Sequence, residues 1–244
     1  MYILQQIDSL QNKINQLRPF EGQLLQQLRA YYKIGFTWSS NALEGNTLTE
    51  SETKVLLEDG LTVGGKPLRY TFEALGHARA FDYMFELMQH NTIGEQDILQ
   101  LHRLFYADIE PEYAGKYRDI AVIVSGSRYP VTAPPEIAAA VQQLCHWISE
   151  QRDQLHPVVF AALLHKKFVF IHPFKDGNGR VARLLMNTAL IQKGYLPVII
   201  PPILRSNYIA LLEKAHTLDQ PFVEFIAELE KESQREILRL LNIH

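Results

Sequence analysis

HPFKDGNGRVAR, residues 172–183, is the stretch that most constrains the fold and the chemistry of this 244-residue chain. It places an imidazole, a carboxylate, two glycines and two guanidinium groups within about one loop and one helical turn. Gly177 and Gly179 can adopt backbone angles that other residues avoid, so successive N–H groups can turn inward and bind an anion. A helix that begins directly after them adds the positive end of its dipole. The stretch therefore predicts a phosphate-binding site.

The charged residues of this stretch indicate the chemistry of that site. Arg180 and Arg183 are three apart, which places them on one helix face, and their planar guanidinium groups suit phosphate oxygens. Asp176 is a hard oxygen ligand positioned to hold a divalent ion against those oxygens. His172 is suited to proton transfer near neutral pH, although an isolated histidine among apolar neighbours is usually a core residue. Together these residues predict a polyphosphate with magnesium beside a proton-transfer histidine.

Composition narrows the class of protein. With 244 residues, 47% of them hydrophobic, one domain with extensions is expected. The net charge of −3 gives no electrostatic footprint for nucleic acid. The single cysteine, Cys145, cannot form an intrachain disulfide, which fits a reducing compartment. Neither a secretory signal nor an 18-residue apolar run is present, so a soluble cytoplasmic protein without membrane contact is expected.

Apolar residues recur at helical spacing along most of the chain, so the sequence predicts an all-α fold. Two helices are expected in residues 3–34 with a break near Pro19; their glutamines also suit a coiled-coil arm, but the pattern is too short for sustained heptads. Thr49 and Glu52 form a capping-box pattern that starts a helix ending near Gly60. Further helices are expected at residues 69–89, 95–106, 134–151, 157–170, 180–193, 206–216 and 220–241.

Residues 115–131 carry the one clear β signal. A β-branched run, a Ser-Gly-Ser turn and a short return strand predict a β-hairpin. A lone hairpin is only marginally stable in water, so this one is expected to lean on the helices. Taken alone, it would be an ordinary surface hairpin.

The stretch 172–183 resembles in full the signature of the Fic family, His-Pro-Phe-x-Asp/Glu-Gly-Asn-Gly-Arg-x-x-Arg. Those enzymes mostly transfer AMP from ATP to a hydroxyl side chain of a protein. The resemblance implies that His172 is the base for the target hydroxyl and that Asp176 holds Mg²⁺. It also implies phosphate ligands: Gly177, Asn178 and Gly179 as an anion hole for the α- and β-phosphates, Arg180 on the phosphates and Arg183 on the γ-phosphate.

A second pattern concerns regulation. Considered alone, residues 37–46 predict a short helix that stops at Gly45, with a solvated Glu44. Beside the full signature, however, Ser40, Glu44 and Gly45 resemble the family's inhibitory pattern Ser/Thr-x-x-x-Glu-Gly/Asn. The resemblance implies that Glu44 pairs with Arg183 and denies it to the γ-phosphate. The hairpin resembles the family's flap, in which Val122, Ile123 and Val124 would pair with the target as an added strand.

The resemblance extends over roughly residues 37–216 and implies a Fic-type helical domain with one β-hairpin. We expect an N-terminal helical extension in residues 1–60, carrying the inhibitory motif, and the catalytic core with C-terminal helices in residues 61–244. The expected activity is magnesium-dependent transfer of AMP from ATP to a Ser, Thr or Tyr hydroxyl of a target protein. Two alternatives stay open: removal of AMP from such a target, and a nucleotide-binding regulatory module with negligible turnover. The target, the dominant direction and a homodimeric state are also open.

Overall fold

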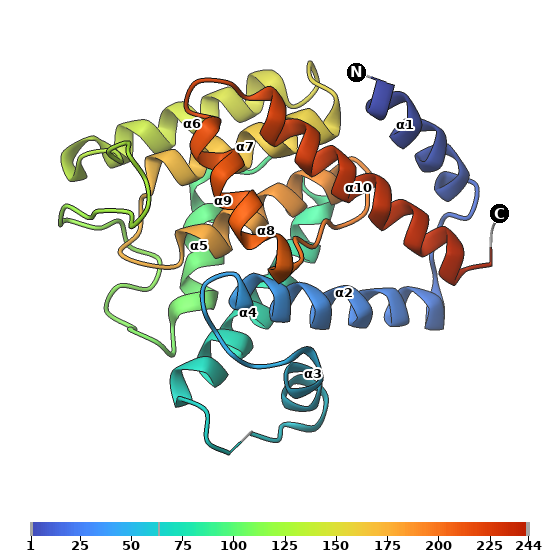
Figure 1. The fold of residues 1–244 in the computed structure, drawn as a ribbon, viewed down its shortest axis with the longest axis horizontal. Coiled ribbons are helices and arrows are strands. Elements are labelled where there is room, and N and C mark those ends of the chain that lie inside the picture. The colour runs from blue at the N-terminus through green and yellow to red at the C-terminus, as the bar shows by residue number, and fades with distance from the viewer. Residues whose placement is uncertain (1, 63, 243–244) are drawn as a thin grey trace.

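The computed structural model of the protein describes residues 2–62 and 64–242. In this part of the chain the regular structure is helical throughout, with ten α-helices, three short 3-10 helices and no β-strand (Figure 1). The predicted all-α fold is confirmed.

Helix α8, Asn178–Gln192, lies at the centre of the fold (Figure 1). All side chains from Val181 to Ile191 are buried, because predominantly apolar residues occupy every face of the helix. The start of α8, which belongs to the phosphate-site stretch, is thereby anchored in the core. Three helices pack against it: α7 (Pro157–Ile171), α4 (Leu68–Glu86) and α5 (Glu95–Tyr106).

Two helices form the N-terminal region, as predicted: α1 (Tyr2–Asn15) and α2 (Gly22–Ala42). Helix α1 packs along α10 (Gln220–Leu240) and buries Ile7 and Ile14 in the main hydrophobic core. The N-terminal helices are therefore part of the packed domain, and the alternative of a free coiled-coil arm is wrong.

Helix α2 corrects one prediction, because residues 37–46 do not form a separate short helix. The helix continues through Gly35, which packs so closely against Ile199 that an added Cβ would lie 3.0 Å from its Cδ1 atom. Burial of Phe36 on the same stretch sustains the helix up to Ala42. The following turn ends at Gly45, whose φ of 95° suits glycine, so the predicted stop is confirmed.

Helix α3 (Glu50–Asp59) begins as the capping box predicts. The Glu52 N–H donates to Thr49 Oγ1 at 3.1 Å, and the Thr49 N–H donates to Glu52 Oε2 at 2.7 Å. No helix in the described residues is long and apolar enough to cross a membrane. The remaining elements are α6 (Ile137–Gln151), α9 (Arg205–Lys214) and the 3-10 helices η1 (Leu87–Gln89), η2 (Pro134–Glu136) and η3 (Pro202–Leu204).

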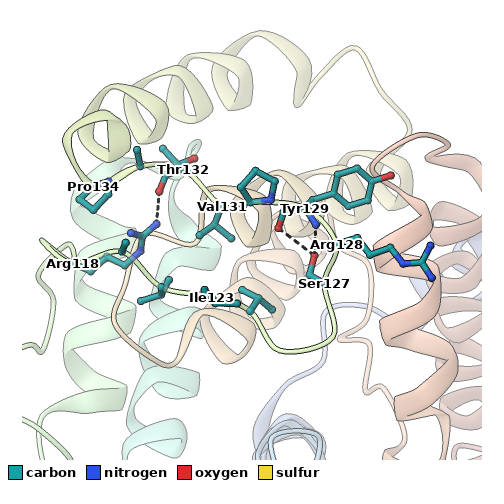
Figure 2. Close-up of a pocket in the computed structure, with 13 residues that line it drawn as sticks. Arg118, Ile123, Ser127, Arg128, Tyr129, Val131, Thr132 and Pro134 are labelled. Atoms are coloured by element: carbon teal, nitrogen blue, oxygen red, sulfur yellow. Dashed lines mark hydrogen bonds between the residues drawn. The ribbon is translucent and has the colours of Figure 1, made fainter.

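The segment 118–133 lacks the predicted β-hairpin. The chain does turn, with the Ser127 N–H donating to Val124 O at 3.1 Å, but this is the only backbone hydrogen bond within the segment among the described residues. We call the parts of the segment before and after this turn its two arms. They surround a cavity of about 500 Å³ (Figure 2). A two-stranded ribbon is marginal by itself, and here contacts with Arg118 and Glu213 hold the arms in place of a cross-strand ladder.

Candidate active site

His172 follows α7 and turns the chain into the loop that precedes α8. Its backbone is left-handed, with a φ of 53°, and its N–H donates to Phe168 O at 3.1 Å. Such a conformation costs a residue other than glycine roughly 1–3 kcal/mol in free energy, so it persists only where the surrounding structure holds it. The sharp turn places the imidazole at the end of a rigid helix and at the start of the phosphate-site loop.

Asn178 closes this loop with its side chain. Its Oδ1 accepts from the Phe174 N–H at 2.9 Å, and its Nδ2 donates to Phe174 O at 2.8 Å. Both residues are buried, so these bonds are protected from water. The Asn178 side chain therefore shapes the loop and is not free to bind an anion.

His102, on α5, lies beside the phosphate-site loop and is not among the residues that the sequence predicts for the site. Its Nδ1 accepts from the Gly115 N–H at 2.9 Å, so Nε2 carries the proton and donates to Asp176 O at 3.1 Å. The ring also stacks on Phe174, with centroids 3.7 Å apart. Burial lowers the pKa of His102 to about 4, which keeps it neutral. Its partners are distant in sequence, so no local pattern could have revealed this role.

Gly177 and the first residues of α8 occupy the place where the sequence predicts an anion site. Gly177 has a φ of 79°, and an added Cβ would lie only 2.8 Å from the Phe105 ring, so glycine is required there. Helix α8 begins at Asn178, directly after it, so the predicted helix is present but starts before residue 180, the predicted start. The first N–H groups of a helix have no intrahelical partner, and they carry the positive end of its dipole.

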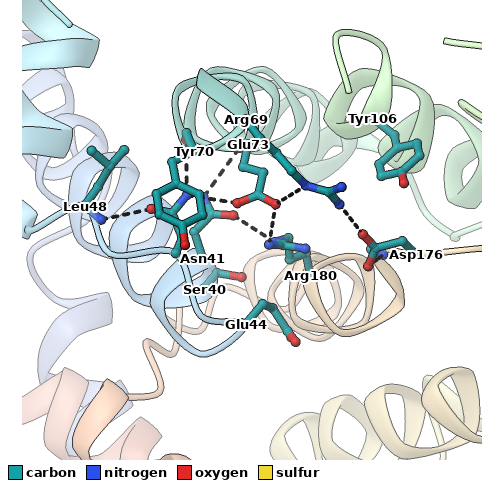
Figure 3. A network of polar contacts seen from close by, with 12 residues as sticks. Ser40, Asn41, Glu44, Leu48, Arg69, Tyr70, Glu73, Tyr106, Asp176 and Arg180 are labelled. Carbon is teal, nitrogen blue, oxygen red and sulfur yellow. Dashed lines mark hydrogen bonds and ion pairs between the residues drawn. The ribbon is translucent and has the colours of Figure 1, made fainter. Parts of the chain in front are cut away.

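Asp176 presents a half-exposed carboxylate beside this helix start. Oδ1 accepts from the Gly177 N–H at 2.6 Å, and Oδ2 accepts from Arg69 Nη2 at 2.6 Å (Figure 3). No group of three or more His, Cys, Asp or Glu side chains suited to a metal occurs in residues 2–62 and 64–242. A lone carboxylate fits Mg²⁺, which proteins usually bind through one or two carboxylates together with phosphate oxygens and water.

Arg180 is buried and engaged by two other helices (Figure 3). Its Nε donates to Asn41 Oδ1 at 2.8 Å, and its Nη2 lies 3.2 Å from Glu73 Oε1. Glu73 also accepts from Arg69 Nε at 3.1 Å. Arg180 thus contributes positive charge at the start of α8 while it joins α8 to α2 and α4. The sequence could not reveal Asn41, Glu73 and Arg69 as partners, because they lie far from Arg180 along the chain.

Arg183 and Glu44 form the ion pair that the resemblance implies. Arg183 Nη2 lies 2.8 Å from Glu44 Oε1, and the guanidinium also donates to Ser40 Oγ and Ser40 O, each at 2.9 Å. Glu44 lies directly over the start of α8, since a Cβ added to Gly179 would overlap its Oε1. Burial alone would raise the pKa of Glu44, but Arg183, followed by Arg180, outweighs it and holds the carboxylate ionised.

Two further buried residues, Tyr208 and His165, form a hydrogen-bond chain with Arg183. Arg183 Nη1 donates to the Tyr208 hydroxyl at 3.4 Å, and this hydroxyl lies 2.9 Å from His165 Nε2. Burial lowers the pKa of His165 to about 3, so the ring is neutral and its Nε2 can accept the Tyr208 proton. The sequence interpretation assigned no role to either residue.

A cavity of about 150 Å³ lies above the start of α8, lined among others by Glu44, His172 and Gly179. Residues 124–127 and 129–131 form part of its wall. They are fastened to α9 by Glu213, which accepts from Ser127 Oγ at 2.9 Å and from the Arg128 N–H at 2.7 Å. Of the predicted flap residues, Val122 and Val124 are half-buried and Ile123 is 96% exposed.

The surroundings of His172 favour its neutral form. Burial lowers its pKa below the ordinary value, and the positive charge of Arg118 acts in the same direction. The carboxylates of Glu44 and Asp176 raise the pKa but do not reverse the shift. At pH 7 the imidazole is therefore able to accept a proton.

Comparison with known proteins gives consistent matches. The Fic/DOC family model matches residues 92–190. The protein adenylyltransferase Fic of Drosophila grimshawi is 44% identical over 194 residues, which make up 78% of this chain and 40% of that protein. This chain therefore spans about two fifths of that relative's length.

Two solved structures extend the match to almost the whole chain. Fic-1 from C. elegans is 30% identical with a TM-score of 0.89, covering 98% of this chain and 72% of that one. A Fic domain containing signaling protein from Bacteroides thetaiotaomicron is also 30% identical, with a TM-score of 0.85 and coverages of 94% and 95%. The chain belongs to the Fic/DOC family.

Proposed function

We propose that this protein transfers AMP from ATP to a Ser, Thr or Tyr hydroxyl of a target protein, and that Glu44 restrains the reaction. The observation that carries the proposal is the Arg183–Glu44 ion pair seated on the start of α8. An anion site built from a helix start, glycines and arginines is covered there by the protein's own carboxylate. The name protein adenylyltransferase, given to a relative with 44% identity, supports the same activity.

The proposed reaction begins with His172. Its lowered pKa keeps Nε2 or Nδ1 free to take the proton of the target hydroxyl as that oxygen attacks the α-phosphorus of ATP. The bond between the α-phosphorus and the bridging oxygen to the β-phosphate breaks, and pyrophosphate leaves with that electron pair. AMP remains on the target as a phosphodiester, and His172 carries the proton.

The phosphate ligands stabilise the charge that moves onto the phosphates. The N–H groups of Asn178 and Gly179 are proposed to face the α- and β-phosphates, with the positive charge of Arg180 behind them. The Gly177 N–H, which donates to Asp176 Oδ1 here, is proposed to join them when that carboxylate turns to the metal. Arg183 is proposed to exchange Glu44 for the γ-phosphate. Asp176 is proposed to hold Mg²⁺, which would neutralise phosphate charge when bound. The protein's contribution is thus mainly positioning and electrostatics.

The proposed target site is the segment that carries Val122, Ile123 and Val124. Because its two arms do not pair with each other, the backbone groups that Arg118 and Glu213 do not engage are open to an incoming extended segment. Ile123 exposes an apolar side chain to such a partner. This docking would hold the target hydroxyl close to His172. A cytoplasmic location and a homodimer stay predictions from the sequence.

We keep the division into residues 1–60 and 61–244 as a functional proposal. The first part carries the inhibitory motif, residues 37–46, and the second carries the catalytic residues. One hydrophobic core includes Ile7 and Phe36 from the first part together with α8 from the second. Because cores are closely packed, this supports the proposal that a structural change in the first part acts on the catalytic residues of the second.

Removal of AMP from a modified target is a second candidate. Glu44 lines the same cavity as His172. A carboxylate in that position could align a water molecule on a phosphodiester. The nucleotide-binding module without turnover has no such observation in its favour and serves as an outcome of the test.

The test uses ATP labelled on the α-phosphate or on the γ-phosphate, with the wild type and Glu44→Gly. Label that reaches protein from the α position alone supports AMP transfer. Label from the γ position would indicate phosphate transfer instead. Nucleotide binding without label transfer in either protein would favour the binding module. Loss of label from a premodified target, dependent on Glu44, would favour the second candidate.

A further inference from the structure

Arg118 connects His172 to the segment 118–133 and is buried, with 3% of its surface exposed. Its backbone N–H donates to Pro173 O at 2.9 Å, and its side-chain Nε donates to His172 O at 2.9 Å. The two ends of its guanidinium donate to Ile120 O, at 2.9 Å, and to Thr132 O (Figure 2). One side chain thus holds the carbonyl of His172 and the bases of both arms.

The charge of Arg118 has no carboxylate to balance it among the described residues, because its side-chain hydrogen bonds all go to backbone carbonyls. Burial of such a charge is costly. Burial also lowers the pKa of Arg118. A neutral donor such as glutamine could bind some of these carbonyls at a smaller desolvation cost. Stability alone therefore does not account for a guanidinium here.

The backbone conformation of His172 explains why a guanidinium is present at position 118. Its left-handed backbone, with a φ of 53°, is unfavourable for a residue with a side chain and needs an external restraint. Arg118 provides that restraint on the carbonyl side, while the Phe168 carbonyl holds the N–H side. The same guanidinium fixes the arms between which the proposed target segment would dock.

We propose that Arg118 is a positioning residue for the reaction: it holds His172 in its left-handed conformation and couples that residue to both arms of the segment 118–133. The inference rests on the proposed function and deepens it. Arg118 transmits docking of a target to the base, since movement of either arm acts on the guanidinium that holds the His172 carbonyl.

A pH-dependent consequence follows from the charges that face His172. Arg118 lowers its pKa, whereas Glu44 and Asp176 raise it. Removal of the positive charge of Arg118 therefore raises the pKa of His172. Because the base acts in its neutral form, the rise in activity with pH shifts to higher pH.

The experiment compares Arg118→Gln and Arg118→Lys with the exposed control Arg128→Gln, all in the Glu44→Gly background. Arg128 is exposed in the same segment, and only its backbone N–H is hydrogen-bonded among the described residues, so its substitution removes one positive charge without removing a side-chain hydrogen bond. The measurements are kcat and KM for ATP, the pH profile of kcat, the NMR titration of the His172 imidazole, and the melting temperature.

Arg118→Gln is expected to lower kcat by about 10-fold to 100-fold, since small misplacements of a reacting group can have effects of this size. KM for ATP should stay within about twofold of the parent, because the phosphate ligands are unchanged. The His172 titration and the pH profile should both move to higher pH. Arg118→Lys should keep the parent pH profile, because the charge remains, and should recover part of kcat. Arg128→Gln should match the parent in all these measurements.

The inference is overturned if Arg118→Gln keeps the parent kcat, or if it loses ATP binding in proportion to kcat, which indicates general structural damage. Should Arg118→Gln fail to fold at the assay temperature, Arg118→Lys decides, and a parent-like kcat in that variant overturns the inference. A His172→Ala variant separates the two levels. If it stays active, the assignment of His172 as the base fails, and the role of Arg118 fails with it; if it is inactive while Arg118→Gln resembles the parent, only the role of Arg118 fails. Absence of α-label transfer in the Glu44→Gly parent would instead contradict the proposed function.

Discussion

The two regions that flank His172 are built in opposite ways. Residues 172–183 are closed by local hydrogen bonds, with Asn178 on Phe174 and the Asp176 carboxylate on Gly177, and they lead into a helix that is buried on every face. The segment 118–133 has one backbone hydrogen bond of its own among the described residues, and is held by Arg118 at its base and by Glu213 at its tip.

This difference matches the roles proposed for the two regions: nucleotide binding for residues 172–183 and target docking for residues 118–133. A fixed ligand such as a nucleotide is best met by groups that need no rearrangement. A protein segment of variable sequence is better met by backbone groups that are free to pair. The predictions below test this contrast between a preorganised region and an adaptable one, beginning with the largest effect.

His172→Ala in the Glu44→Gly background should have the largest effect on activity. We expect a loss of about 10²-fold to 10⁴-fold in AMP transfer, the usual scale for general acid–base catalysis. ATP affinity and the melting temperature should change little, because no phosphate ligand or core contact is removed. Measurement of α-label transfer and ATP binding checks this, and near-parent transfer would remove His172 from the mechanism.

Asp176→Ala should reduce transfer nearly as much, and added magnesium should rescue part of it. The carboxylate is the proposed metal ligand, and it also accepts from Arg69 and from the Gly177 N–H. Binding of Mn²⁺ in the presence of ATP, followed by its relaxation signal, gives a readout independent of activity. Asp176→Asn, which keeps the shape and one acceptor oxygen, is the matched control for the lost charge. Unchanged Mn²⁺ binding in both variants would contradict the assignment.

Asn178→Ala should destabilise the protein, because it leaves the buried N–H and C=O of Phe174 without partners. Each such group costs about 1–3 kcal/mol, so we expect the free energy of unfolding to fall by about 2–6 kcal/mol. Urea titration measures it. A loss below about 0.5 kcal/mol, the range of surface substitutions, would mean that the loop is not held by this residue.

Ile123→Ser is the counterpart in the adaptable region and should have the smallest effect on stability. Ile123 is 96% exposed, so the free energy of unfolding should change by less than about 0.5 kcal/mol. KM for the target protein should rise while KM for ATP stays constant. An equal rise in both KM values would place Ile123 outside target docking.

The contrast between the regions also explains what the sequence could predict. Local patterns sufficed for the Thr49–Glu52 capping box and for the presence of the helices, although α2 continues through the predicted short helix and α8 starts before residue 180. They failed for residues 118–133, where β-branched residues predict strands but long-range contacts to Arg118 and Glu213 hold the backbone open.

Long-range partners were equally beyond the reach of local patterns. His102 holds the loop carbonyl of Asp176 from 74 positions away, and Asn41 holds Arg180 from 139 positions away. Neither residue carries a motif of its own. The Arg183–Glu44 pair, by contrast, was anticipated because a family pattern linked its two members.

The central claim is that Glu44 occupies Arg183 and thereby restrains an otherwise complete site. Each 1.4 kcal/mol of such restraint is about tenfold in the population of the competent state, so Glu44→Gly should raise AMP transfer by about 10-fold to 1000-fold. Arg183→Ala breaks the same ion pair but also discards the proposed γ-phosphate ligand, so it should not activate.

The decisive measurement is self-modification with α-labelled ATP, at saturating ATP and magnesium, for the wild type, Glu44→Gly, Arg183→Ala and the double variant. The account predicts strong labelling of Glu44→Gly alone. Equal labelling of Glu44→Gly and the wild type, or activation by Arg183→Ala, would contradict it.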